Sequence, residues 1–319
     1  MDTYFQAFVN GYAGYFNYLR DEILHPSWNN YLYWLIGLSL AVWALELIFP
    51  WRKQQQAIRK DFWLDAFYLF FNFFLFSLIA YNAISNVAVV AFNDFLGLFG
   101  VRNLVAIQVD QLPVWGQLSI LLVVRDLIQW NVHRLLHRVP WLWEFHKVHH
   151  SVEEMGFAAH LRYHWMETII YRTFEYIPLA MIGFGIQDFF LVHIFTLAIG
   201  HLNHANIYLP LGPLKYVFNN PQMHLWHHAE KLPKGSYGVN YGITFSFWDY
   251  LFGYAYIPKE DSGIKLGFSD LAAFPKTFWS QITYPWTKHE RTSEQLENMV
   301  DGKPDSRPGS LRTRATPFW

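Results

Sequence analysis

Histidine is the residue type in this chain that could carry chemistry, and its placement is uneven. The chain holds 15 histidines, and 13 of them lie between His133 and His228. Cysteine is absent, which removes disulfides, thiolate metal ligands and thiol catalysis together. Imidazole is therefore the main ligand that the chain can offer to a transition metal.

Eight of these histidines fall into three boxes with helical spacing. The first box is HxxxH, and the second and third are both HxxHH. The boxes contain His133 and His137, then His146, His149 and His150, then His224, His227 and His228. Residues three and four apart share one face of a helix, so each box presents its imidazoles together. Packing alone would require a hydrogen-bond partner for every buried imidazole, whereas one metal ion satisfies several. We therefore predict that the boxes bind metal.

The number of histidines in the boxes indicates two metal ions. Eight nitrogen ligands exceed the four that a typical site uses, and two ions with four or five nitrogens each fit the count. Imidazole leaves iron, zinc, copper and nickel open. No HExxH zinc-protease motif is present, and the single Glu-x-x-His pair, Glu22 and His25, stands apart from the boxes. Asp126 shares a helical stripe with His133 and His137, so we expect it to orient a ligand imidazole.

The composition indicates that helices in a lipid bilayer position these boxes. The chain is 53% hydrophobic and 15% charged, against about 25% charged residues in an average soluble domain. Residues 31–49 carry one charge, and residues 66–93 carry none; both blocks are long enough to cross a bilayer. Residues 111–124 are expected to continue as one helix into the first box. Residues 165–207 are expected to form a membrane hairpin of two helices.

We therefore predict an all-α, multi-span membrane protein. It would have about four membrane helices, arranged as two hairpins, and a cytosolic helical cap that carries the boxes. Loop 51–60 is the most basic short connection, which assigns it to the cytosol, and counting spans brings all three boxes to that side. The predicted division is an N-terminal segment at 1–30, membrane helices at 31–125, a histidine-box catalytic domain at 126–256 that includes the hairpin, and a polar C-terminal tail at 257–319.

The boxes and their flanking residues resemble the fatty acid hydroxylase / sterol desaturase superfamily of integral-membrane non-haem di-iron oxygenases. HKVHHSVEEM is similar to that family's second box, and NNPQMHLWHH to its third. NYGITFSFWDYLFG, at 240–253, resembles its closing signature, and the similarity covers roughly residues 126–256. The chain departs from the pattern at SYGVNYG, where relatives often carry an acid before Asn-Tyr-Gly.

The resemblance implies that the eight box histidines ligate two non-haem iron ions and that O2 is the co-substrate. It also implies further ligands between the second and third boxes, where GHLNHAN supplies His204 and, with less weight, His201. LRYHWME is similar to the segment after the second box. By that similarity His164 becomes a further candidate ligand, with less weight, and Arg162 a residue that supports the ligands. Asn240, in the closing signature, is expected to support the ligands as well.

These implications predict an O2-dependent hydroxylase or monooxygenase that acts on a fatty acyl, sterol, alkylglycerol or carotenoid-like lipid. Attack on an unactivated C–H bond is beyond any amino-acid side chain. Two electrons are expected from an external ferredoxin or haem-type redox protein, because no flavin or nicotinamide fingerprint is present. Lys147 is expected at the cytosolic surface, where such a donor could dock. A net charge of −1 gives no footprint for nucleic acid.

Three other functions stay open from the sequence. A lipid desaturase would share the same ligands. A metal-binding membrane transporter without oxygenase activity would need polar residues along several spans, whereas residues 66–93 offer only Asn and Ser as polar groups. A haem-binding electron carrier would give a visible Soret band. Whichever function applies, the chain is expected to be an integral membrane protein of a bacterial inner membrane or the endoplasmic reticulum, with the boxes facing the cytosol.

Overall fold

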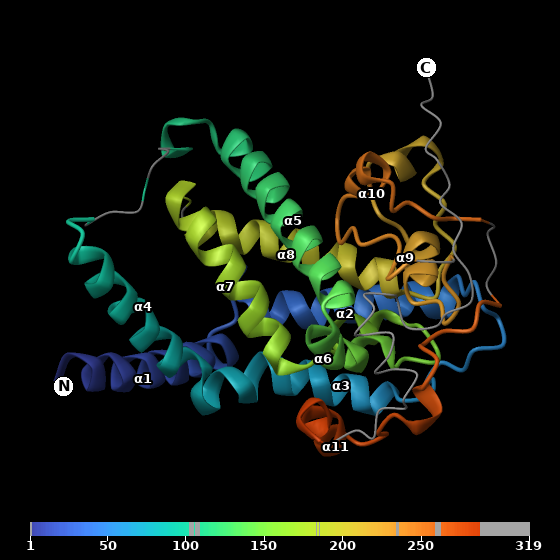
Figure 1. Cartoon of the computed structure of the whole chain (residues 1–319), viewed down its shortest axis with the longest axis horizontal. Helices are drawn as coiled ribbons and strands as arrows, with labels where there is room; N and C mark the ends of the chain where they lie inside the picture. Colours follow the sequence, from blue (N-terminus) through green and yellow to red (C-terminus); the bar gives the residue numbers. More distant parts are fainter. Residues whose placement is uncertain are drawn as a thin grey trace, which may run out of the picture.

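A computed structural model of the chain describes residues 2–101, 105, 109–182, 184, 186–233, 236–258 and 263–287. Across these ranges the secondary structure is helical, and β-pairing is confined to isolated bridges such as the one between Pro50 and Ile207. The all-α prediction is confirmed for this part of the chain. Figure 1 shows the long helices crossing one another, with the short helices gathered at one end.

Two described segments are long and apolar enough to cross a membrane, Tyr31–Ile48 and Phe62–Ile79. The first is α2 (Tyr31–Ile48). The second starts as α3 (Phe62–Phe70) and continues through two π-helical stretches, η1 (Phe71–Leu75) and η2 (Ser77–Tyr81), into α4 (Asn82–Gly97). These segments match the first two apolar blocks of the sequence. The total of four membrane helices stays a prediction.

The N-terminal segment forms a helix of its own. This helix, α1 (Asp2–Leu24), packs mainly along α4, and the pair lies together at one side of the molecule (Figure 1). Gly11 allows the close approach, because a Cβ there would meet the backbone of Ala83 and Asn82 at 3.0 and 3.1 Å. The N-terminal helix is therefore packed along the helix that follows the second candidate span.

The first histidine box lies at the C-terminal end of a long helix that begins in the third apolar block. This helix, α5 (Val114–Arg138), begins after Pro113 and ends before Pro140, as expected because the residue before a proline avoids helical geometry. It confirms that the third apolar block and the first box form one helix. It contacts α7 (Trp165–Ile182) and α8 (Ile186–His204). These are the two helices expected within 165–207, and their break at Gly183 and Gly185 lies outside the described residues.

Short helices carry the second and third boxes. The second box lies on α6 (Pro140–His150), which Pro140 opens at a position where its missing N–H is not needed. The third box lies on α9 (Pro221–His227), where Asn220 caps the first turn by accepting a hydrogen bond from the Met223 backbone N–H at 3.0 Å. The following loop leads into α10 (Phe247–Phe252).

Part of the predicted polar tail at 257–319 packs against the core of the molecule. Residues 263–287 contain α11 (Phe278–Thr283) and the short turns around it. Phe268, Leu271, Phe274 and Phe278 form one hydrophobic core with Tyr68 and Val148, among other buried residues. The aromatic residues of this stretch, spread between polar ones, were not recognised in the sequence as a packing pattern. Residues 288–319 lie outside the described part.

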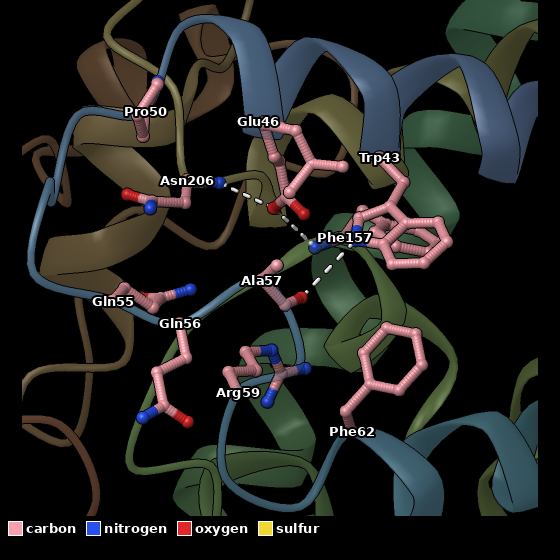
Figure 2. A pocket seen from close by; sticks show the side chains of 11 residues that line it. Trp43, Glu46, Pro50, Gln55, Gln56, Ala57, Arg59, Phe62, Phe157 and Asn206 are labelled. Atoms are coloured by element: carbon pink, nitrogen blue, oxygen red, sulfur yellow. Dashed lines mark hydrogen bonds between the residues drawn. The ribbon is translucent and has the colours of Figure 1, made fainter.

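The only charged residue of α2 ties that helix to the histidine-bearing region. Glu46 Oε1 accepts hydrogen bonds from the backbone N–H groups of Phe157 at 2.9 Å and Asn206 at 2.7 Å, as Figure 2 shows. Asn206 follows α8 by two residues, and its side chain also accepts from the Arg52 N–H at 2.8 Å. These bonds fix the end of α2 against the end of α8, beside a cavity of about 190 Å³ that Trp43, Glu46 and Phe157 help to line.

Candidate metal centre

The structure gathers nine buried histidines into two clusters. In each cluster, every histidine contributes one ring nitrogen, and these nitrogens all lie within 4.8 Å of one another. The five-histidine cluster contains His133, His137, His146, His150 and His227, and the four-histidine cluster contains His149, His204, His224 and His228. All eight box histidines are present. His204 at the end of α8 is the ninth.

The five-histidine cluster directs one nitrogen of each ring inward with no partner. Nε2 of every member is buried and has no hydrogen-bond partner among the described residues. The opposite nitrogen of three members faces an acceptor: Nδ1 of His133 lies 2.9 Å from the Tyr241 carbonyl, Nδ1 of His146 lies 2.9 Å from Glu167 Oε2, and Nδ1 of His227 lies 2.8 Å from the Val239 carbonyl. A neutral imidazole that donates from Nδ1 leaves a lone pair on Nε2. The cluster therefore presents lone pairs to one point.

The four-histidine cluster repeats this division of roles. Nδ1 of His149 lies 3.0 Å from the Arg162 carbonyl, and Nδ1 of His204 lies 2.8 Å from the Gly200 carbonyl. Their Nε2 atoms, both left as lone pairs by those bonds, face each other at 3.3 Å. His224 Nε2 lies 2.9 Å from His204 Nε2. Lone pairs at these distances repel unless a cation lies between them, so the arrangement fits a bound metal ion.

The two clusters adjoin each other. The rings of His150 and His228, one from each cluster, stack with centroids 4.3 Å apart, and those of His149 and His228 lie 4.6 Å apart within the second cluster. His146 and His149, again one from each, stack at 5.3 Å. Sites for two ions would thus lie side by side, with both HxxHH helices contributing to both.

Burial keeps these rings neutral. It lowers the pKa of His146 to about 3, and together with neighbouring imidazoles such as His146 it lowers the pKa of His133 and His149 to about 3 as well. A neutral imidazole is the form that ligates metal. The set contains nitrogen donors and no carboxylate, which suits iron, zinc, copper or nickel and does not suit calcium or magnesium.

The loop after α9 supplies two of the acceptors. Val239 and Tyr241, whose carbonyls face His227 and His133, flank Asn240. Asn240 has a left-handed backbone with φ of 51°, and its side-chain Nδ2 donates to the Met223 carbonyl at 2.8 Å. Asn240 thus turns the chain so that the carbonyls of its two neighbours face two different histidines. The sequence indicated Asn240 as a supporting residue, and the structure places it beside the ligand-orienting carbonyls.

Asp126 has a different role from the one predicted. It contacts no imidazole directly; its carboxylate accepts from the backbone N–H groups of Thr244 at 2.9 Å and Phe245 at 3.3 Å and from Trp248 Nε1 at 3.1 Å. The helical stripe points Asp126 at the loop after α9, because α5 passes behind that loop. Asp126 therefore holds the loop whose carbonyls orient the histidines.

Glu167 is the carboxylate that does contact a cluster histidine, and sequence reasoning did not single it out. It is 3% exposed and its Oε2 lies 2.9 Å from His146 Nδ1. The signal was present in LRYHWME, whose resemblance to the family segment after the second box includes this acid. Arg162 from the same segment supports the site twice. Its carbonyl accepts from His149, and its buried side chain donates to Ser151 Oγ at 2.8 Å and Asp65 Oδ1 at 3.2 Å.

The structure does not bring His201 or His164 into either cluster. His201 Nε2 lies 3.1 Å from Ser39 Oγ and its Nδ1 lies 3.1 Å from His160 Nδ1. Both nitrogens of His164 have backbone partners, the Ile282 carbonyl at 2.9 Å and the Met166 N–H at 3.1 Å. Their spacing next to the boxes suggested ligands, but both nitrogens of each ring already face other partners.

Lys147 does not reach the surface as expected. Its side chain is buried, pairs with Glu144 Oε2 at 2.8 Å and lies over the Phe268 and Tyr284 rings at 5.7 and 5.5 Å. The residues that cover it come from 263–287, which had been read as a polar tail.

Comparison with known proteins identifies the same region. Residues 118–254 match the family model described as fatty acid hydroxylase. Ornithine lipid hydroxylase OlsE of Rhizobium tropici is 32% identical over 182 residues, which are 57% of this chain and 54% of that protein. Alkylglycerol monooxygenase of Xenopus tropicalis is 31% identical over 133 residues, 40% of this chain and 28% of that protein.

A third relative is more distant. Methylsterol monooxygenase 1 of Rattus norvegicus is 28% identical over 134 residues, 41% of this chain and 43% of that protein. The matches thus span about half of the length of OlsE and a smaller share of the other two. No solved structure matches the chain.

Proposed function

We propose that this chain, whose residues 118–254 belong to the fatty acid hydroxylase family, is an O2-dependent non-haem di-iron hydroxylase. Its substrate would be a membrane lipid, into which it inserts one oxygen atom at a C–H bond. The observation that carries the proposal is the pair of adjoining clusters, in which nine buried imidazoles each bring one ring nitrogen to within 4.8 Å of those of the other members.

The residues of this chain have defined tasks in that reaction. Two bound iron ions would supply the activation of O2 that no side chain can provide. The carbonyls of Tyr241, Val239 and Arg162 and the carboxylate of Glu167 fix which nitrogen of each ring faces inward. Such outer partners commonly change metal affinity or activity 10- to 100-fold when removed. The burial of all nine rings also keeps bulk water away from the site.

Three features support a lipid as the substrate. The names of the relatives specify ornithine lipids, alkylglycerols and methylsterols for those proteins. Tyr31–Ile48 and Phe62–Ile79 are apolar enough to lie in a bilayer. Glu46 joins the end of the first of these segments to the chain two residues beyond His204. A lipid held along these helices would therefore lie close to the four-histidine cluster.

The proposal includes an orientation and a partner. We place the histidine clusters on the cytosolic side of the membrane, with a membrane hairpin at 165–207 completing about four spans. The reducing equivalents would come from an external ferredoxin or haem-type redox protein. A desaturase would use the same residues and the same electrons, so only the product distinguishes it.

The decisive experiment measures iron and product in the same preparations. The chain is purified in lipid nanodiscs, its iron is quantified, and lipid extracts of producing and non-producing cells are compared by mass spectrometry under isotopically labelled O2. We expect about two irons per chain and a lipid product heavier by one labelled oxygen atom. His149→Ala removes one lone pair from the four-histidine cluster, so it should lower both iron content and product.

His25→Ala is the matched control, because His25 lies outside both clusters and its side chain is 74% exposed. It should leave iron and product unchanged. The proposal fails if His149→Ala keeps its full iron content or if product forms without O2. A product lacking two hydrogens would assign desaturation. Metal uptake into proteoliposomes without any lipid product would assign transport.

A further inference from the structure

Two arginines follow directly after the two histidines of the first box. Arg134 is half-buried, and its guanidinium lies over the Trp130 ring at 4.9 Å and the Tyr254 ring at 5.8 Å. Arg138, one turn further along α5, is exposed and lies over the Tyr237 ring at 5.9 Å. Within the described part of the chain neither forms an ion pair. Their positive charges are therefore held in fixed positions by aromatic rings and left uncompensated.

Both arginines line a cavity of about 240 Å³. Its wall is made of Arg134, Arg138, Ser236, Tyr237, Tyr241 and Tyr254. These are two cations, three phenol rings and a hydroxyl, so the cavity suits an anionic polar group and not an acyl chain. The carboxylates of a protein surface can enter such a cavity and pair with arginine through two parallel hydrogen bonds.

Tyr241 belongs both to the wall of this cavity and to the surroundings of the five-histidine cluster. Tyr241 is 1% exposed and lines the cavity. Its ring centroid lies 5.2 Å from that of His137, 5.8 Å from His133 and 6.0 Å from His227. On the cavity side the Tyr254 ring is 5.2 Å away. The cluster is thus covered here by one layer of aromatic rings.

The proposed reaction needs such an approach from outside. Hydroxylation converts R–H and O2 into R–OH and water, and the second oxygen atom reaches water only with two electrons and two protons from outside the substrate. The chain carries no flavin or nicotinamide motif to hold them. A protein that delivers one electron at a time must therefore bind twice per turnover near the metals.

We propose that Arg134, Arg138 and the tyrosines around them form the docking site for an acidic one-electron carrier protein. This inference rests on the proposed function. The arginines attract and orient the carrier's carboxylates, and Tyr241 lies between the docked partner and the metal ligands. Lys147, the residue first suggested for this role, is paired with Glu144 and covered.

The test measures binding and not activity. Oxidised plant-type [2Fe–2S] ferredoxin, an acidic one-electron carrier, is titrated onto the full chain in nanodiscs of neutral phosphatidylcholine, with and without iron. Wild type should bind it with a Kd that rises steeply with salt. Arg134→Glu/Arg138→Glu should weaken binding at least about 10-fold and abolish most of the salt dependence, because like charges now face each other.

Two further variants make the result interpretable. Arg138→Glu alone alters an exposed residue, so it tests the site even if the double variant folds poorly. Lys53→Glu makes the same charge change on the exposed loop between α2 and α3 and should leave the Kd unchanged. In iron-loaded protein, the rate at which reduced ferredoxin reduces the metal centre should fall in parallel with binding.

Three results would overturn the proposal: no ferredoxin binding to wild type, equal binding to Arg138→Glu and wild type, or equal weakening by Lys53→Glu. Binding of short-chain phosphatidylglycerol in place of ferredoxin, lost in Arg138→Glu, would instead make the cavity a lipid headgroup site. Failure of the proposed function is recognised separately, by missing iron or missing O2-derived product, because ferredoxin binding is also measured on the iron-free protein.

Discussion

At the scale of single residues, the surroundings of each ring decide what it can do. His146, His149 and His164 lie within 19 positions of one another and are all buried. His146 and His149 have one nitrogen bound to an oxygen acceptor and the other facing a cluster. His164 has both nitrogens occupied by the backbone. A histidine therefore becomes a ligand candidate here only where one nitrogen is left free.

Glu167 provides a direct test of this division. In Glu167→Ala, Nδ1 of His146 loses its acceptor, so the ring can change tautomer and the Nε2 lone pair is no longer fixed. We expect metal affinity to fall about 10- to 100-fold. Glu167→Gln keeps an acceptor oxygen and should lose less. Both are measured by metal analysis after dialysis against a graded series of chelator concentrations.

Glu153→Gln is the matched control for Glu167. Glu153 pairs with Lys60 at 2.8 Å and Lys276 at 3.2 Å and touches no imidazole. Metal affinity should stay at the wild-type value. Equal loss in the Glu153 and Glu167 variants would show that the effect arises from general charge and not from the bond to His146.

At the scale of elements, the loop between α9 and α10 is the part that sets the geometry of the five-histidine cluster. Two buried acids hold it. Asp249 accepts from the Tyr241 N–H at 2.9 Å, the Gly242 N–H at 2.8 Å and Trp130 Nε1 at 2.9 Å. The carboxylate of Asp126 on α5 holds the following part of the loop by accepting a hydrogen bond from the Thr244 backbone N–H. The closing signature of the sequence therefore acts mainly through backbone groups.

Gly242 tests the precision of this loop. A Cβ at Gly242 would lie 2.4 Å from the Phe245 carbonyl oxygen and 2.9 Å from Asp249 Oδ2. Because the nearer atom belongs to the backbone, Gly242→Ala should shift the loop and destabilise the fold by about 1–3 kcal/mol. Metal content should also fall, since the neighbouring Tyr241 carbonyl orients His133.

Thermal unfolding and metal analysis of the same samples check this expectation. Gly14→Ala is the control, because a Cβ there meets nothing within 4 Å and alanine favours the helix. It should leave both quantities at or slightly above wild type. Unchanged melting and metal content in Gly242→Ala would mean that the loop is free to adjust and does not set the cluster geometry.

At the scale of the whole molecule, the histidine clusters gather in one region, and α1 to α4 carry a large share of the exposed apolar side chains. The nine cluster histidines come from α5, α6, α8 and α9 and from His228 directly after α9. These helices converge in one region of the molecule (Figure 1). Large exposed apolar side chains are frequent on α1 to α4, for example Phe5, Leu40, Trp63 and Phe95. The exposed apolar residues of the two candidate spans suit contact with lipid, whereas the nine histidines are buried and shielded from bulk water.

The absence of cysteine makes the orientation directly measurable. Lys53→Cys lies in the basic loop between α2 and α3, and Trp28→Cys replaces a residue that is 83% exposed before α2. With a cytosolic basic loop, an impermeant maleimide should label only Trp28→Cys in intact cells and Lys53→Cys after lysis. The reverse pattern would invert the proposed topology, and labelling of both in intact cells would contradict a span at Tyr31–Ile48.

The sequence by itself determined the chemistry that this protein can offer. Residues three and four apart share one face of any helix, so the histidine boxes can be recognised from the sequence before the fold is known. The absence of cysteine limited the possible metal ligands, and the long apolar blocks indicated that part of the chain lies in a lipid bilayer. These features also indicated the family, and the match at 118–254 confirms it.

Only the tertiary structure decided which histidines meet and what orients them. His204, His201 and His164 are all candidate ligands from the sequence, but only His204, at the end of α8 where it contacts α9, joins a cluster. Glu167 replaces Asp126 as the carboxylate beside a ligand, and residues 263–287 cover Lys147. These outcomes depend on contacts between segments far apart in the chain, which local spacing does not encode.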